Sequence, residues 1–315
     1  MDWDKVRERI RGPVASMITP LNDDHSIDVE GFRENARFLL DNGYVEGKAV
    51  VMAATPPGED TDLTLDERKM VMRLLAEEAG GKVPLITSAT DNSLDTVIDL
   101  AKYAHDLGYT TIQLPPPYYH GTTPDEVFEW YERVAKAVDI GISVYNTTWL
   151  GILGGVGFQE ALIERFTEIP NIVAIKWSSP NRWMYIQVLT KFKDRFAIVD
   201  NQWKGLGAMF GAKAMLTVTA NFHPKRELDI WALLEAGRYG EAIELWKKLT
   251  LPYYMWIQAM RKQGINGEAP IVKAPMRLAG RPAGPSKPPY DHKFTPEQLA
   301  WLKEILIKGG VPGVK

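Results

Sequence analysis

A lysine follows an apolar stretch in the segment NIVAIKWSSP, residues 171–180. The four aliphatic residues at 172–175 predict a buried β-strand, and Lys176 comes directly after them. A lysine attacks a carbonyl group only as the neutral amine, and at an unperturbed pKa of about 10.4 roughly one in 2,500 is neutral at pH 7. Apolar surroundings lower this pKa, and a value of roughly 7–8 would increase the neutral fraction by several hundredfold. Lys176 is therefore a candidate for forming a Schiff base.

A tyrosine lies near the end of another apolar stretch, GISVYN at 141–146. The phenol of Tyr145 is suited to carry protons between a carbonyl oxygen, a carbinolamine and a departing alcohol. The structural alternative for Lys176 is an ion pair with a carboxylate such as Asp200, or an ammonium group that extends from the strand end into solvent. With Tyr145 predicted at the same depth, these residues alone support the catalytic and the structural interpretation equally.

The elements that must position these residues follow a regular alternation. Short apolar stretches are followed by amphipathic stretches of helical period, as in residues 28–43. Strands that alternate with helices form parallel βαβ units, and eight of them fit a closed (β/α)8 TIM barrel of the α/β class, with catalytic groups at the C-terminal ends of the strands. The predicted strands are residues 14–19, 48–54, 83–89, 110–115, 141–146, 171–176, 196–201 and 214–219.

The chain continues beyond the eighth predicted strand. Helical patterns run through residues 224–260, a Pro- and Gly-rich crossing occupies 279–290, and a last helix is expected near 295–308. We therefore expect residues 1–223 to hold the barrel strands and catalytic mouth. Residues 224–315 are expected to hold the last barrel helix and a C-terminal helical extension, packed as one structural unit. Capping boxes predict three helix starts, at Thr64 with Glu67, Thr123 with Glu126 and Thr295 with Gln298.

Composition excludes several kinds of site and partner. The 315 residues are 45% hydrophobic with a formal charge of −3, which lacks the basic excess expected of a nucleic-acid or membrane-surface partner. The absence of cysteine excludes disulfides and thiolate chemistry, and the five histidines show no metal-ligand spacing. The charged N-terminus lacks the apolar core of a signal peptide, and no apolar run reaches the roughly 18 residues that a membrane span needs. A cytoplasmic protein is therefore expected.

The chain resembles the dihydrodipicolinate synthase / N-acetylneuraminate lyase family of class I aldolases from about residue 12 to its end. The matching segments occur in the family's order: ITPLNDDHSID, GED with LTLDER, PPPYYHG, VYN, IVAIK and GAKAMLTVTAN. The resemblance implies that Lys176 is the Schiff-base lysine, that Tyr145 is the proton-transferring phenol, and that Tyr119 is lent across a subunit interface. It also implies a homotetramer built as a dimer of dimers, with no cofactor besides the covalent imine between lysine and substrate.

The loop that follows the second predicted strand departs from the family. Its usual pattern, G-[ST]-T-G-E, holds the carboxylate of a 2-oxo acid through hydroxyl and backbone N–H groups. Here the segment is ATPPGED, in which Gly58 and Glu59 match but Pro56 and Pro57 replace the hydroxyl residues. Proline has neither a hydroxyl nor a backbone N–H, so only Thr55 could restore one hydroxyl, in a reshaped loop. Glu59 is expected to be a structural carboxylate that bonds loop backbone.

A second departure follows Tyr145. Dihydrodipicolinate synthases typically carry an arginine five residues after this tyrosine, and here that position is Leu150. Lysine-pathway synthase activity is therefore not expected. Aromatic residues are predicted around the mouth instead, which favours a flat or apolar portion of the substrate. The predicted substrate-binding residues are Thr55, Pro56, Pro57, Gly58, Trp149, Asn201 and Leu216; Trp177, which alternates with Lys176, is expected to face the helices.

These observations favour a Schiff-base lyase, of aldolase or hydratase-aldolase type, that acts on a 2-oxo acid or related ketone with an aromatic or apolar aldehyde portion. A dehydratase of 2-keto-3-deoxy sugar acids is the alternative within the same chemistry, although its hydroxylated substrate would require a polar rim. The alternative from another class is a catalytically silent barrel that binds a small molecule, which the two prolines support and the retained Lys176 and Tyr145 oppose.

Overall fold

The eight predicted strands form a closed barrel in sequential order, from β1 to β8. The computed structural model describes residues 1–150 and 152–315. Neighbouring strands from β3 to β8 pair in parallel, and the predicted (β/α)8 class is confirmed. The strands are β1 (Gly12–Ser16), β2 (Val50–Ala53), β3 (Leu85–Ser88), β4 (Thr111–Leu114), β5 (Gly141–Tyr145), β6 (Ile172–Trp177), β7 (Ala197–Asp200) and β8 (Ala214–Thr217).

An α-helix follows each strand except β7, which is followed by a 3-10 helix (Leu206–Phe210), and a short α-helix precedes β1. The α-helices are α1 (Trp3–Arg9), α2 (Val29–Asp41), α3 (Leu65–Ala79), α4 (Leu94–Asp106), α5 (Pro124–Ala137), α6 (Glu160–Phe166), α7 (Arg182–Phe192), α8 (Pro224–Glu235), α9 (Tyr239–Lys248), α10 (Thr250–Lys262), α11 (Glu268–Leu278) and α12 (Pro296–Lys308). The capping boxes of Thr64, Thr123 and Thr295 are all present, which confirms the predicted starts of α3, α5 and α12.

Several strand boundaries differ from the prediction. Strand β6 continues one residue beyond Lys176, to Trp177, so the lysine is not the last strand residue as predicted. Strand β1 ends at Ser16 instead of residue 19, and Thr219 lies in a short 3-10 helix after β8. Apolar residues at these ends are buried beyond the last ladder hydrogen bond, so hydrophobicity alone overestimates strand length.

The chain divides into two compact units, each with its own core. The first comprises residues 1–14, 45–52 and 81–216, and its apolar cluster includes Val14, Val50, Val173 and Leu216. The second comprises residues 15–44, 53–80 and 217–315. Its cluster is built largely from α10, α11 and α12.

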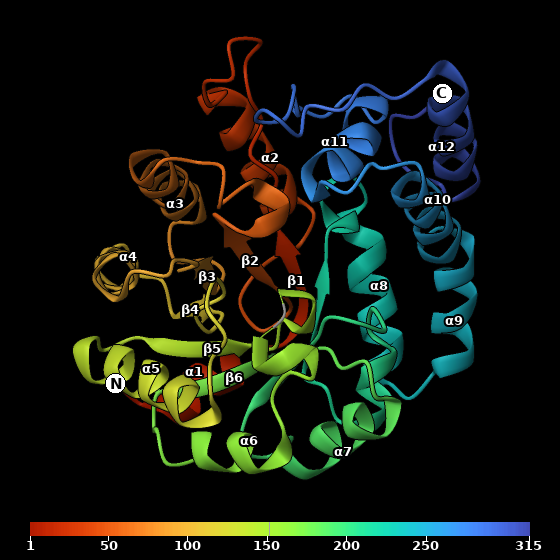
Figure 1. Cartoon of the computed structure of the whole chain (residues 1–315). Helices are drawn as coiled ribbons and strands as arrows, with labels where there is room; N and C mark the ends of the chain where they lie inside the picture. The colour runs from red at the N-terminus through yellow and green to blue at the C-terminus, as the bar shows by residue number, and fades with distance from the viewer. Residues whose placement is uncertain (151) are drawn as a thin grey trace. The chain divides into compact units, whose positions relative to one another are not determined.

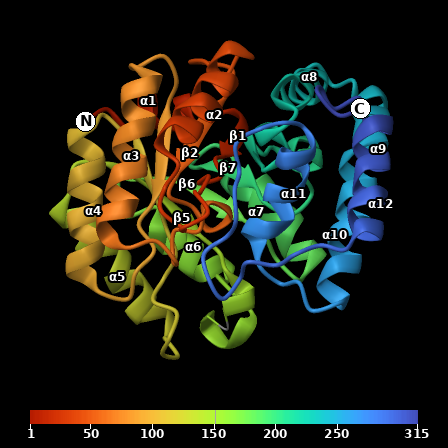
Figure 2. The ribbon, with the colours of Figure 1, turned by 90° about the horizontal axis from the view of Figure 1, so that it is seen from above.

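Helix α11 was not predicted, because prolines and a Gly-rich segment mask its pattern. Pro275 lies inside it and lacks the N–H that would bond the carbonyl oxygen of Ile271. The hydroxyl of Tyr253, on α10, donates to that oxygen at 3.0 Å, so the broken helical hydrogen bond is replaced from a neighbouring helix. In the same unit α10 packs on α9 and α12, and Figures 1 and 2 show α10 and α12 side by side from two directions. Among the described residues, no helix is long and apolar enough to cross a membrane.

Candidate active site

Lys176 and Tyr145 lie opposite each other on adjacent strands of the first unit. The β5–β6 ladder pairs Tyr145 with Lys176, so the predicted match in depth is confirmed. The ammonium nitrogen of Lys176 is 3.8 Å from the centroid of the Tyr145 ring. Both side chains are buried, with 4% of Lys176 and 7% of Tyr145 exposed. An amine and a phenol are thus held together, away from bulk water, on two hydrogen-bonded strands.

The next residue along β6 points the other way. Trp177 is fully buried, and its indole N–H donates to the carbonyl oxygen of Tyr185 on α7 at 3.3 Å. The prediction that Trp177 faces the helices is confirmed. Because side chains alternate along a strand, this orientation turns Lys176 to the opposite face, toward the barrel interior.

Asp200, the carboxylate proposed as a structural partner for Lys176, has another set of partners. Its two oxygens accept hydrogen bonds from the Tyr185 hydroxyl and from the backbone N–H groups of residues 202, 203, 205 and 207. Burial and the negative charge of Asp200 raise the pKa of Tyr185, which keeps its hydroxyl protonated as a donor. Asp200 therefore shapes the loop after β7. Trp203 in this loop stacks on the Tyr185 ring, at 4.6 Å between centroids, and so serves packing.

Trp149 is one of the aromatic residues predicted around the mouth, and it contacts Tyr145. It lies in a 3-10 helix, Thr148–Leu150, after β5, and its ring meets the Tyr145 ring edge-on at 5.7 Å. The Trp149 side chain is 56% exposed, whereas the Tyr145 side chain that it contacts is buried. Tyr119, in the loop after β4, is 82% exposed and contacts the His120 ring.

The remaining predicted residues of the first unit occupy different environments. Asn201 follows β7; its N–H donates to the carbonyl oxygen of Trp177, and its own carbonyl oxygen accepts from the ammonium group of Lys204 at 3.0 Å. Lys204 has a positive φ of 51°, which is unusual for a residue other than glycine. Leu216, on β8, is buried within the apolar cluster of this unit. Leu216 thus packs in the apolar cluster, and Asn201 lies directly after the C-terminal end of β7.

The loop after β2 belongs to the second unit. Pro56–Gly58 form one turn of 3-10 helix that begins after Thr55 and ends at Glu59. The Thr55 hydroxyl is 2.5 Å from that of Ser16, and the Gly58 carbonyl oxygen accepts from the Thr19 hydroxyl at 2.7 Å. A Cβ added to Gly58 would lie 2.6 Å from the Met17 carbonyl oxygen, so this position requires glycine.

The backbone donors of this loop are used within the loop itself. The N–H groups of Gly58 and Asp60 donate to the carbonyl oxygen of Thr55, and that of Glu59 donates to the carbonyl oxygen of Pro56. Pro56 and Pro57 have no N–H to offer. The backbone N–H groups of this loop are therefore already paired within it, as the two prolines led us to expect, and the Thr55 hydroxyl shares a hydrogen bond with that of Ser16.

Glu59 has a structural role, as predicted, with a partner that the sequence did not indicate. Its carboxylate pairs with Lys273 of α11 at 2.5 Å and accepts the backbone N–H of Lys287 at 2.6 Å. Lys273 is fully buried, and burial lowers the pKa of its ammonium. More than 200 residues separate Glu59 from Lys273 in the chain, and Lys273 lies in α11, the helix that was not predicted from the sequence.

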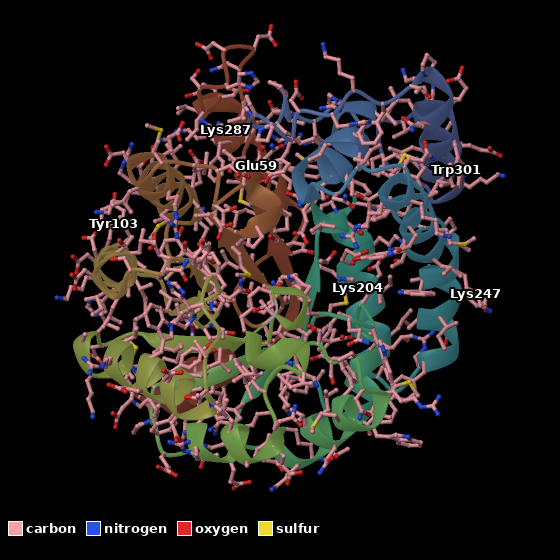
Figure 3. The ribbon with its side chains drawn as sticks, viewed as in Figure 1. Glu59, Tyr103, Lys204, Lys247, Lys287 and Trp301 are labelled. Carbon is pink, nitrogen blue, oxygen red and sulfur yellow. The ribbon has the colours of Figure 1, made fainter. Side chains whose placement is uncertain are left out.

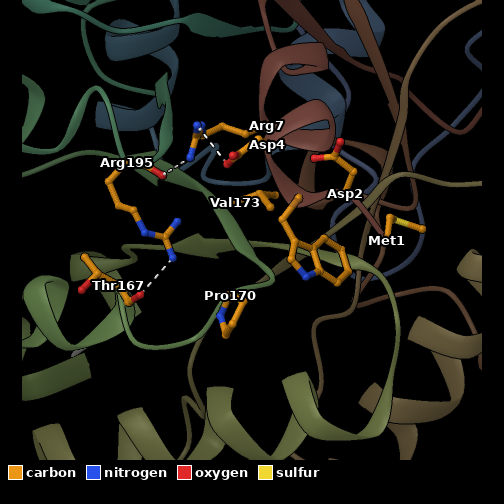
Figure 4. Close-up of a pocket in the computed structure, with 9 residues that line it drawn as sticks. Met1, Asp2, Asp4, Arg7, Thr167, Pro170, Val173 and Arg195 are labelled. Atoms are coloured by element: carbon orange, nitrogen blue, oxygen red, sulfur yellow. Dashed lines mark hydrogen bonds and ion pairs between the residues drawn. The ribbon is translucent and has the colours of Figure 1, made fainter.

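A cavity of about 500 Å³ lies in the first unit, away from Lys176 (Figure 4). It is lined by α1 residues, including Trp3 and Arg7, by Val173 near the start of β6, and by Arg195 before β7. The guanidinium group of Arg195 donates to the carbonyl oxygens of residues 167, 169 and 172. The cavity is thus at the N-terminal end of β6, opposite the end that carries the lysine, and Arg195 binds backbone carbonyl oxygens there.

Comparison with known proteins agrees with this arrangement. The sequence model of the Dihydrodipicolinate synthetase family matches residues 9–306. The chain belongs to this family. Its members are lyases of the class I aldolase type.

The relatives within the family act in different reactions. The chain is 30% identical to a 4-hydroxy-tetrahydrodipicolinate synthase from Methanopyrus kandleri, over 96% of this chain and 98% of that protein. It is 26% identical to an N-acetylneuraminate lyase from Pasteurella multocida, over 96% and 99%. A dihydrodipicolinate synthase structure from Oceanobacillus iheyensis has the same fold, with a TM-score of 0.84 and 22% identity over 98% of this chain and 99% of that one. Family membership therefore gives the fold and the reaction type, and the substrate has to be argued from the site.

Proposed function

We propose that this protein is a Schiff-base lyase of aldolase or hydratase-aldolase type, acting on a 2-oxo acid or related ketone with an aromatic or apolar aldehyde portion. The observation that carries the proposal is the buried amine of Lys176, 3.8 Å from the Tyr145 ring on the neighbouring strand. An amine held in this setting is suited to nucleophilic attack, and the adjacent phenol to proton transfer. No cofactor besides the lysine imine is required for this chemistry.

In the cleavage direction, Nζ of Lys176 adds to the keto carbon of the substrate and water leaves, which gives an iminium ion. Tyr145, to which we assign the proton transfers, gives its proton to this departing water and is left as a phenolate. The phenolate then takes the proton of the hydroxyl group on the second carbon from the iminium carbon, and the bond between that hydroxyl-bearing carbon and the carbon next to the iminium carbon breaks. The bonding electrons move to the iminium nitrogen as an enamine forms and the aldehyde departs. Protonation of the enamine carbon and addition of water release the 2-oxo acid and restore the amine. Condensation is the same sequence in reverse.

The aldehyde portion is inferred from the residues beside Tyr145. The exposed indole of Trp149 meets the phenol edge-on, so a flat or apolar group can stack there. Thr55 is the proposed hydroxyl contact for the acid end, with Pro56, Pro57 and Gly58 lining the same loop. Residence in the cytoplasm, and a homotetramer in which Tyr119 completes a neighbouring site, remain part of the proposal.

A condensation assay tests the substrate class. The protein is incubated with pyruvate and either benzaldehyde or glyceraldehyde, and the products are identified by mass. Faster turnover of the aromatic aldehyde supports the proposal. Turnover of glyceraldehyde alone, or dehydration of a 2-keto-3-deoxy sugar acid as the faster reaction, would assign the protein to hydroxylated substrates instead.

A further inference from the structure

One of the most deeply buried charged groups outside the proposed chemistry is the ammonium group of Lys273. It donates to the Glu59 carboxylate at 2.5 Å and to the Pro285 carbonyl oxygen at 2.6 Å. Both ion-pair partners are buried, with 0% of Lys273 and 3% of Glu59 side chain exposed. All three residues lie in the second unit, so these contacts belong to one compact body.

The other oxygen of Glu59 is also held from the C-terminal segment. It accepts the backbone N–H of Lys287 at 2.6 Å, and Figure 3 labels both residues. The ammonium group of Lys287 pairs with Glu67 at the start of α3. Glu67 in turn closes the capping box with Thr64. The loop after β2 is therefore bound to residues 273 and 287 through Glu59, and the first turn of α3 is bound to residue 287 through Glu67.

Glu59 is the residue that ends the 3-10 turn. Its backbone is left-handed, with φ of 65°, and its N–H donates to Pro56 while its carbonyl oxygen accepts from residues 62 and 63. A left-handed non-glycine residue is strained and persists only where surrounding contacts fix it. The ion pair of the Glu59 carboxylate with Lys273 supplies such a contact. Glu59 ends the 3-10 turn that begins directly after Thr55.

We propose that Lys273 is a positioning residue for the loop after β2: within the second unit, through Glu59, it fixes the shape of residues 55–59, and with it the direction of the Thr55 hydroxyl. This inference rests on the proposed function, because Thr55 is there the contact for the substrate carboxylate. The C-terminal helical extension then affects substrate affinity indirectly, through the shape of this loop. Buried ion pairs add little net stability compared with apolar residues of the same volume, so a directional role accounts for the charge better than packing does.

The variants Lys273→Met and Glu59→Gln test this. Each keeps the approximate side-chain volume and removes the charge pairing. Lys247→Met is the matched control, because Lys247 forms an ion pair with Glu244 on the surface of α9 in the same unit. Pyruvate is titrated with borohydride present, and the extent of covalent labelling at Lys176 is measured by peptide mass. Amide hydrogen exchange of residues 58–60 is measured on the same samples.

We expect Lys273→Met and Glu59→Gln to raise the pyruvate concentration for half-maximal labelling tenfold or more, with the maximal extent within twofold of wild type. The double variant should match the single variants, and Lys247→Met should match wild type. Protection of the amides at 58–60 should fall at least tenfold in the first two. An unchanged half-maximal concentration in a folded variant would overturn the proposal, and so would unchanged amide protection.

The experiment distinguishes a variant that does not fold from a wild-type protein that pyruvate does not label. If Lys273→Met does not fold, the isosteric Glu59→Gln variant decides with the same readouts. If pyruvate labels no lysine in wild type, the proposed function with pyruvate fails, and the amide protection at 58–60 still decides whether Lys273 fixes the loop.

Discussion

The ammonium nitrogen of Lys176 lies 3.8 Å from the centroid of the Tyr145 ring, and the two residues are paired across the β5–β6 ladder. Their relative position is therefore set by backbone hydrogen bonds and not by a mobile loop. Two short strands thus bring a nucleophile and a proton carrier together, which is the kind of rigid support that catalytic groups need.

Replacing Tyr145 by phenylalanine should slow turnover while leaving the lysine available. We expect kcat to fall by about 10²–10⁴, the usual contribution of a positioned acid or base. Labelling of Lys176 by pyruvate and borohydride should persist, because the amine is unchanged. The control is Tyr103→Phe, a phenol on α4. Equal kcat values for the Tyr145→Phe variant and wild type would remove Tyr145 from the mechanism.

Replacing Trp149 by alanine should act on the choice of aldehyde. Loss of the indole is expected to raise KM for an aromatic aldehyde about three- to tenfold, equivalent to roughly 0.5–1.5 kcal/mol, and to change KM for a small aliphatic aldehyde less. Trp183→Ala is the matched control, because Trp183 is also exposed, at 68%, and lies on α7. Parallel changes for both aldehydes would show that Trp149 does not select the aromatic group.

Replacing Asp200 by asparagine should destabilise the loop after β7. The carboxylate accepts from four backbone N–H groups and from Tyr185, and an amide can accept with only one of its two terminal atoms. We expect the free energy of unfolding to fall by about 1–3 kcal/mol in urea titrations. Tyr185→Phe, which removes one donor alone, should cost less. Equal stability of the Asp200→Asn variant and wild type would contradict this account of the loop.

His223 should make stability fall as the solution is acidified. Burial and the charge of Arg226 lower the pKa of His223 to about 4, whereas an unfolded histidine titrates near 6.5. Between these values the unfolded chain binds the additional proton, so this contribution is complete above pH 6.5 and is lost as the pH falls toward 4. The slope is at most about 1.4 kcal/mol per pH unit.

The His223→Gln variant isolates this effect. Urea titrations of variant and wild type at several values between pH 7 and pH 4.5 give the free energy of unfolding of each. The free energy of unfolding of wild type minus that of the variant should decrease as the pH falls, because only wild type loses the histidine contribution. A difference that stays constant over this range would show that His223 is not held neutral in the folded protein.

The barrel and the lysine–tyrosine pair could be predicted from sequence because both depend on local patterns. Apolar strand periods place Lys176 and Tyr145 at strand ends, and strand order then makes them neighbours. The exact strand ends could not be predicted, since burial continues past the last ladder bond. The partners of Asp200 were also beyond prediction, because four of them are backbone groups of its own loop.

The Glu59–Lys273 pair shows a different limit. Glu59 was expected to bond loop backbone, and it does accept the N–H of Lys287. Its ionic partner stands in a helix with two prolines, where no periodic pattern signals a helix, and Tyr253 compensates for one missing donor. A long-range charge pair of this kind depends on tertiary packing, which no local pattern encodes.

The most direct test of the central claim is reductive trapping. The protein is treated with borohydride in the presence of pyruvate and of a panel of larger 2-oxo acids, and its peptides are analysed by mass. We predict that at least one of these acids adds its reduced mass to the peptide that contains Lys176, and that the Lys176→Arg variant stays unlabelled. Folded protein that carries no adduct on Lys176 with any of these acids would contradict the Schiff-base mechanism.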